Sequence, residues 1–208
     1  KEYVQKLIDS GHAYYCTCSA ERLETMRREA QARGKNPLYD GTCRDKGLPS
    51  SPGAVVRFRT PDTGKTILED VVKGSIAVDN SETGDFVIQR GDGTPTYHFA
   101  VVVDDITMGV NTIIRGDDHV ANTPRQMMLY NALGCELPKY AHVPMVLGSD
   151  RARLSKRHGA MSVLEYRDMG FLPEGLLNYL VRLGWSHGDQ EVFTIQELKE
   201  LFSLDHIG

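Results

Sequence analysis

The sequence lacks a hydrophobic run long enough to cross a membrane, and we expect no signal peptide before its first amphipathic segment. It also lacks internal repeats and low-complexity tracts. Its 208 residues, 40% hydrophobic and 25% charged, suffice for one large domain or two small ones with a core. These properties are typical of a soluble globular protein, and we expect no membrane partner.

A large excess of positive charge is missing as well. The formal net charge of -4 argues against a protein that coats nucleic acid indiscriminately. A local basic groove is still compatible with this charge, because electrostatic steering depends on the local field and not on the total.

The chain has no initiator methionine, and both of its ends are abrupt. Residues 1–11 already have the spacing of an amphipathic helix, and residues 204–208 directly follow a helical pattern. We therefore expect this chain to be the middle of a longer protein.

Cysteine is scarce and unevenly placed. Cys16, Cys18 and Cys43 cluster, whereas Cys135 stands alone and is most simply a small hydrophobic residue. In a chain without secretory features, clustered thiols favour a metal site over a disulfide framework or three free thiols. Soft thiolates favour zinc, so the cluster predicts a structural zinc site.

Structural zinc takes four ligands, and the fourth is not obvious from the pattern. Asp45 follows Cys43 at the same two-residue spacing that separates Cys16 from Cys18, and it is the predicted ligand. Tyr39 and His12 are the alternatives.

Periodicity and capping residues predict a mixed α/β chain. Period-two segments between Gly53 and Arg90 predict an antiparallel meander. A strand, helix and strand over 111–147 are typical of half of a doubly wound sheet, while 97–105 fits either a strand or a buried helix. The other expected elements are helices at 1–11, 19–33, 163–169, 173–183 and 195–202 and a strand at 13–18.

A cation-dense loop follows the expected strand at 140–147. Arg153, Lys156 and Arg157, with the hydroxyl of Ser155, suit a loop that grips phosphate groups, because Lys supplies a point charge and Arg a planar fork. A solvated basic loop is the alternative for these residues taken alone.

Several motifs stand in one order. Arg153 to Arg157 resembles the KMSKS motif of class I aminoacyl-tRNA synthetases. Further motifs are YDGTCR at 39–44, PTYHFAVVVDD at 95–105, IRGDDH at 114–119, NTPRQ at 122–126 and RLSKRHGA at 153–160. Together they resemble the bacterial glutamyl-tRNA synthetase family over essentially the whole chain.

This resemblance implies an α/β fold containing the second half of a class I synthetase Rossmann domain. An inserted α+β, zinc-bearing, acceptor-binding domain would occupy 1–94, the Rossmann half 95–147, and the KMSKS-type loop with the start of a helical stem-contact domain 148–208. The half with the HIGH motif and the anticodon-binding domain would lie outside the chain, so we expect the chain alone to be inactive.

The resemblance also implies ATP-dependent ligation of L-glutamate to tRNA(Glu) through glutamyl-adenylate, by a cytoplasmic monomer with structural Zn²⁺ and with Mg²⁺ bound to ATP. The implied glutamate-binding residues are Tyr97 and Arg115. The implied ATP-binding residues are Asp118, His119, Val146, Arg153 and Lys156, and the implied catalytic residues are Lys156, Arg153, Ser155 and Arg157.

Residue chemistry supports some of these roles directly. Arg115 ends an expected strand, where it is a natural partner for a carboxylate, although a surface ion pair with Asp117 or Asp118 is the alternative. Tyr97 suits either a hydrogen bond to glutamate or a place in the core.

Two other functions remain open at this point. One is the shorter paralogue that attaches glutamate to queuosine in tRNA(Asp). The other is a non-catalytic, zinc-bearing RNA-binding module.

Overall fold

The computed structural model describes residues 1–145, 147, 150, 162–204 and 207. Contacts divide the chain into two compact units. The first comprises Lys1–Leu68, Ser75–Thr112 and Ala121–Pro138, and the second comprises Glu69–Gly74, Ile113–Val120 and Lys139–Gly208. The three functional segments expected at 1–94, 95–147 and 148–208 stay predictions.

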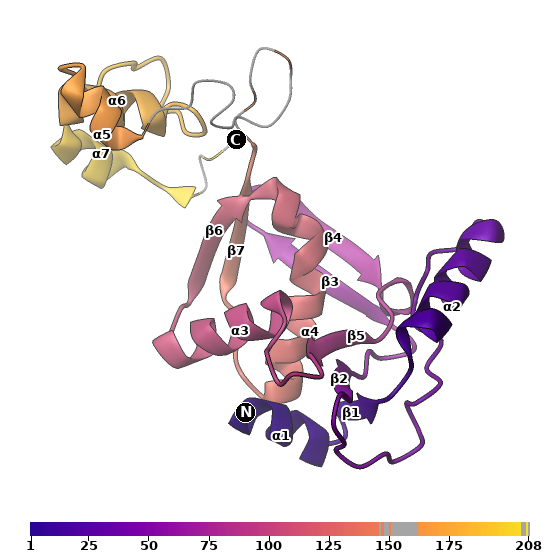
Figure 1. The fold of residues 1–208 in the computed structure, drawn as a ribbon. Helices are drawn as coiled ribbons and strands as arrows, with labels where there is room; N and C mark the ends of the chain where they lie inside the picture. The colour runs from indigo at the N-terminus through magenta and orange to yellow at the C-terminus, as the bar shows by residue number, and fades with distance from the viewer. Residues whose placement is uncertain (146, 148–149, 151–161, 205–206, 208) are drawn as a thin grey trace. The chain divides into compact units, whose positions relative to one another are not determined.

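The described residues form both helices and strands, as expected for a mixed α/β fold (Figure 1). The helices are α1 (Glu2–Asp9), α2 (Ala20–Ala32), α3 (Tyr97–Met108), α4 (Thr123–Leu133), α5 (Val163–Asp168), α6 (Pro173–Val181) and α7 (Ile195–Leu201), with short 3₁₀ turns η1 (Asn80–Glu82) and η2 (Asp117–Asn122). The strands are β1 (Ala13–Cys16), β2 (Val55–Phe58), β3 (Lys65–Asp70), β4 (Gly74–Asp79), β5 (Phe86–Gln89), β6 (Thr112–Gly116) and β7 (Lys139–Val143).

The first unit is built around a three-stranded sheet in the order β1-β2-β5. Both pairings are antiparallel, with Ala13 opposite Phe58 and Arg57 opposite Val87. Helix α1 packs on β1 and α4, while α3 packs on β5 and α4 (Figure 1). The core between them contains Leu7, Phe58, Ile88, Val102 and Leu129.

The prediction of an antiparallel meander over residues 53–90 is wrong. Strand β2 pairs with β1 and β5, and β3 and β4 are neighbours in a different sheet, of order β4-β3-β7-β6. Alternating polarity identifies a strand and its buried face, but it carries no information about which strand lies beside it.

The segment left open between strand and helix is helix α3, whose buried Phe99 and Val102 face the core. The helix expected at 19–33 is α2, and the Ser19 side chain accepts a hydrogen bond from the Arg22 N–H as its cap. None of the α2 residues is buried, in keeping with its few large apolar side chains. The strand expected at 140–147 ends earlier, at Val143, because Pro144 has no N–H for the ladder.

Gly134 ends α4 in the left-handed conformation, with φ 71° and ψ 32°, and its N–H bonds the Tyr130 and Asn131 carbonyls. We expect Gly134→Ala to lower the free energy of unfolding by about 1–2 kcal/mol, because a Cβ disfavours this conformation. Gly175→Ala, in the first half of α6 with nothing near its Cβ position, is the control and should not destabilise. Urea unfolding of both variants checks this expectation, and equal stability would contradict it.

The second unit holds β6, β7 and the end of β3. Asp70, the last residue of β3, pairs in parallel with Tyr140 of β7, and β7 lies beside β6. Helices α5 to α7 follow, with a small core of Trp185, Phe193 and Leu198. No helix within the described part of the chain is long and apolar enough to cross a membrane.

Candidate active site and metal site

Arg115 lies in β6, immediately before Gly116 and the turn η2. Its side chain is half-buried, and its Nε donates a hydrogen bond to Nε2 of His142, at 3.1 Å. A guanidinium only donates, so His142 Nε2 accepts and the ring carries its proton on Nδ1. That Nδ1–H donates to Asp70 Oδ2 at 2.5 Å, with both side chains fully buried.

The other oxygen of Asp70 receives the backbone N–H groups of Val72, Lys73 and His142, at 3.0, 2.9 and 3.1 Å. Burial raises the pKa of the Asp70 carboxyl, but the hydrogen bonds from Lys73 and His142 outweigh it and leave that pKa lowered. Asp70 is therefore a buried carboxylate, and it holds the imidazole of His142 in one tautomer.

The turn after β6 places several of the expected ATP-binding groups near the strand end. Asp118 and His119 lie in η2, with His119 Nε2 3.9 Å from Asp118 Oδ2. Asp117 forms an ion pair with Lys73 at 2.9 Å. Both Asp118 and His119 keep about a third of their side chains exposed, enough for contact with a ligand.

Tyr97 belongs to the first unit, where it begins α3. Its side chain is 52% exposed, and its ring meets that of His98 edge to face at 5.4 Å. The core alternative for Tyr97 therefore does not hold, whereas the hydrogen-bonding role remains a proposal. Val146, Arg153, Ser155, Lys156 and Arg157 lie outside the described residues.

The three clustered cysteines meet in the first unit. Their Sγ atoms all lie within 4.8 Å of one another, and Cys18 and Cys43 are 3.5 Å apart. Sulfur atoms on a zinc tetrahedron are about 3.8 Å apart for metal–sulfur bonds of about 2.3 Å. The cluster therefore has the donor type and the spacing of a structural zinc site.

Of the three candidates for the fourth ligand, Tyr39 lies at this cluster. Its hydroxyl oxygen is 3.4 Å from Cys16 Sγ and 3.3 Å from Cys18 Sγ, and it accepts the N–H of Cys43 at 3.0 Å. The guanidinium of Arg57 stacks on the Tyr39 ring, 3.9 Å from its centre.

Asp45 and His12 do not belong to the cluster. Asp45 accepts a hydrogen bond from Arg59 at 2.7 Å and its side chain is 81% exposed. His12 is exposed, and its Nδ1 lies 2.9 Å from Ser10 Oγ. The prediction of Asp45 from its spacing is not supported, because the chain turns after Cys43 and carries residue 45 towards Arg59.

The cysteine thiols and the Tyr39 hydroxyl change one another's pKa. Burial raises the pKa of the Cys43 thiol, but hydrogen bonds from Tyr39, the Thr17 N–H and Cys18 have the larger, opposite effect and lower that pKa to about 7. Burial first, and then the hydrogen bonds with the cysteines, raise the pKa of the Tyr39 hydroxyl. A thiol that ionises near neutral pH is a competent metal ligand.

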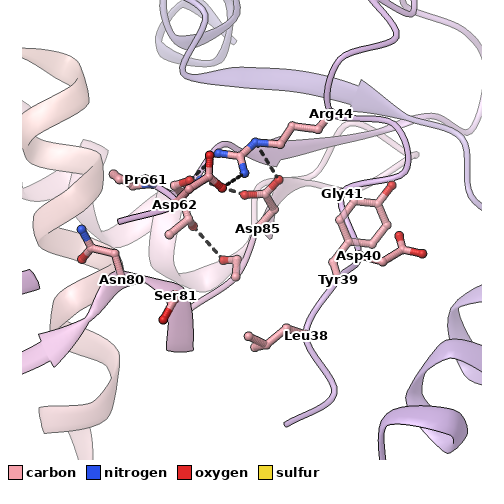
Figure 2. A pocket seen from close by; sticks show the side chains of 12 residues that line it. Leu38, Tyr39, Asp40, Gly41, Arg44, Pro61, Asp62, Asn80, Ser81 and Asp85 are labelled. Carbon is pink, nitrogen blue, oxygen red and sulfur yellow. Dashed lines mark hydrogen bonds and ion pairs between the residues drawn. The ribbon is translucent and has the colours of Figure 1, made fainter. Parts of the chain in front are cut away.

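Arg44 anchors the loop that carries Tyr39 and Cys43. Tyr39 and Arg44 line a pocket of about 280 Å³, shown in Figure 2. The Arg44 guanidinium lies against Asp62, the Thr60 carbonyl and, at 3.6 Å, Asp85. The ion pairs of this pocket therefore join the cysteine loop to the segment after β2 and to the residue just before β5.

Comparison with protein families identifies these features. Residues 1–207 match the model for the catalytic domain of class I tRNA synthetases (E and Q). The chain belongs to this family.

Two glutamate–tRNA ligases are close relatives in sequence. The enzyme of Desulfosudis oleivorans is 75% identical over 207 residues, and that of Syntrophobacter fumaroxidans is 62% identical over 208 residues. Both matches extend over the whole of this synthetase chain, but the chain spans only 44% of the length of each relative.

Solved structures agree with this assignment. The glutamate–tRNA synthetase of Elizabethkingia anophelis has a TM-score of 0.82 at 28% identity, covering 99% of this chain and 48% of its own. A glutamate tRNA ligase of Elizabethkingia meningosepticum, in complex with its amino acid, has a TM-score of 0.83 with the same identity and coverage. The predicted α/β synthetase fold is confirmed at this level.

Sequence patterns did not single out Asp70, His142, Arg57 and Arg44 as functional residues. Asp70 and His142 are 72 positions apart and meet through the pairing of β3 with β7. A histidine inside the otherwise apolar expected strand at 140–147 was the available signal, because a buried imidazole needs a partner.

Proposed function

We propose that the complete protein carrying this chain ligates L-glutamate to tRNA(Glu), with ATP, through glutamyl-adenylate. The observation that carries the proposal is the half-buried Arg115 at the end of β6, held at Nε by a fully buried His142. An arginine at a strand's carboxyl end is suited to bidentate recognition of a carboxylate. The names of the relatives above specify which amino acid that carboxylate belongs to.

The first step needs no general base from the protein. The substrate carboxylate is already ionised at neutral pH and attacks the α-phosphorus of ATP, and pyrophosphate leaves. A ribose hydroxyl of the terminal adenosine of the tRNA then attacks the glutamyl carbonyl, AMP leaves, and the hydroxyl proton passes to the leaving phosphate or to water. Catalysis therefore depends on positioning and on stabilisation of charge at phosphorus.

Positioning is assigned to Arg115 and Tyr97 for glutamate and to Asp118, His119 and the backbone at Val146 for ATP. Charge stabilisation is assigned to Lys156, with Arg153, Ser155 and Arg157 in the same loop. These assignments rest on the order of the motifs and on the family resemblance.

Zinc would be held by Cys16, Cys18, Cys43 and the hydroxyl of Tyr39. It would supply folding free energy to the small cluster around it, whose apolar core is limited to a few residues such as Tyr14 and Val55. Magnesium would accompany ATP and be held largely by its phosphates.

Lys156→Ala tests the loop. We expect kcat for tRNA charging to fall by about 10²–10³-fold, because removal of a charge that acts in the transition state costs about that much, while the KM for glutamate changes little. The measurement is aminoacylation by the complete protein with labelled glutamate, ATP and purified tRNA(Glu).

Lys199→Ala, at an exposed lysine of α7, is the matched control and should keep wild-type kcat. Wild-type protein that charges no tRNA(Glu), or that labels only the queuosine of tRNA(Asp), would overturn the proposed function. Unchanged kcat in Lys156→Ala would overturn the role of the loop alone.

A further inference from the structure

We propose that His142, fixed by Asp70, is a positioning residue that sets the guanidinium of Arg115 for the carboxylate of the amino-acid substrate. The inference rests on the proposed function and deepens it, since it assigns a role to two buried groups that the reaction scheme above does not use.

Two hydrogen bonds link three side chains in series. Asp70 Oδ2 lies 2.5 Å from His142 Nδ1, and His142 Nε2 lies 3.1 Å from Arg115 Nε. Nε is the guanidinium nitrogen next to the aliphatic stem, so a hydrogen bond there restricts rotation of the guanidinium plane. Bidentate recognition of a carboxylate depends on the orientation of that plane.

The histidine and the aspartate of this series are both held in place by their neighbours. The His142 side chain is fully buried, and its ring is stacked on that of Tyr140, 6.2 Å between centres and 10° between planes. Asp70 is held in turn by the N–H groups of Val72 and Lys73. The acceptor offered to Arg115 therefore has a fixed position, as precise substrate sites require.

The choice of histidine has a chemical reason. A neutral imidazole accepts the Nε–H without cancelling the positive charge of Arg115, whereas a carboxylate in its place would neutralise the guanidinium that must attract an anion. The negative charge of Asp70 is one residue further away and is shared with three backbone N–H groups. The arrangement orients Arg115 and preserves its charge.

A pair of amide substitutions in the complete protein tests this. In His142→Asn the amide replaces Nδ1 and keeps a donor for Asp70 but loses the acceptor for Arg115. In His142→Gln the longer amide oxygen restores that acceptor. We expect His142→Asn to raise the KM for glutamate by about 10-fold or more with little change in the KM for ATP, and His142→Gln to recover most of the loss.

A double-mutant cycle covers the case in which His142→Asn does not fold. Arg115→Lys keeps the charge but removes Nε, so His142→Phe, which fills the same space without an acceptor, should raise the KM for glutamate less in that background than in the wild type. Thermal unfolding of each variant reports its stability.

The inference is overturned if His142→Asn leaves the KM for glutamate unchanged, or if the KM values for glutamate and ATP rise together in proportion to lost stability. It is overturned equally if the cycle is additive. Failure of the wild-type protein to charge tRNA(Glu) is a different result, because it removes the proposed function itself.

Discussion

Arg115→Ala is expected to lower kcat/KM for glutamate by about 10²–10³-fold, mostly through KM. Truncation leaves the substrate carboxylate without its charged partner in a partly desolvated site, which costs about 2–5 kcal/mol. It also leaves Nε2 of the fully buried His142 without the Arg115 donor. Steady-state aminoacylation with glutamate varied at saturating ATP and tRNA measures the effect.

Arg167→Ala is the matched control, since Arg167 is an exposed arginine on α5 paired with Asp168. Such surface pairs contribute little, and the KM for glutamate should stay at the wild-type value. A loss in Arg115→Ala of less than about fivefold would contradict the assignment of Arg115 to the substrate carboxylate.

Cys43→Ser is expected to abolish zinc binding and to destabilise the first unit by about 3 kcal/mol or more. The physical reason is that metal-binding free energy is folding free energy wherever the ligands are not preformed in the unfolded chain. The buried Cys43 thiol lies 3.5 Å from Cys18 Sγ, so Cys43→Ser removes one of the three sulfur ligands while the backbone N–H of residue 43 stays available to the Tyr39 hydroxyl. Metal content by mass spectrometry and thermal unfolding provide the two readouts.

Cys135→Ser supplies the control, because Cys135 is a free cysteine outside the cluster. It should retain about one zinc per chain, as a single four-ligand site requires. Wild-type protein purified without metal supplements and found to contain no zinc would contradict the proposed site.

The fourth ligand has its own test. Tyr39→Phe keeps the ring under Arg57 but removes the oxygen, and it should weaken zinc binding by about 10-fold or more, whereas Asp45→Asn should leave the affinity unchanged. Competition with a zinc chelator ranks both variants. The opposite ranking would return the assignment to Asp45.

Local signals predicted local structure well. Ser19 caps α2, and Gly134 ends α4, because hydrogen bonds and backbone conformation at these ends involve residues within four positions of each other. The cysteine cluster was also predicted, since thiols at close spacing on one turn and a third nearby have few other roles in such a chain.

Contacts between residues far apart in the sequence could not be predicted from these local signals. The pairing of β2 with β1 and β5, instead of β3, depends on which apolar faces fit together in the core, and every strand of the region has a similar alternating pattern. Residues 97–105 form a helix because Phe99 and Val102 pack into that core, a choice that their length and composition left open.

The sequence by itself determined the family, the order of the motifs, the thiol cluster and Arg115 as a candidate for the substrate carboxylate, because these depend on residue identity and spacing along the chain. Only the tertiary structure decided that the Tyr39 hydroxyl, and not the Asp45 carboxylate, lies at the thiols. It also decided that His142, hydrogen-bonded to Asp70, accepts a hydrogen bond from Arg115. The physical reason is the same in both cases. A turn and a strand pairing bring together groups from distant positions, and the free energy of those contacts comes from packing that no local pattern encodes.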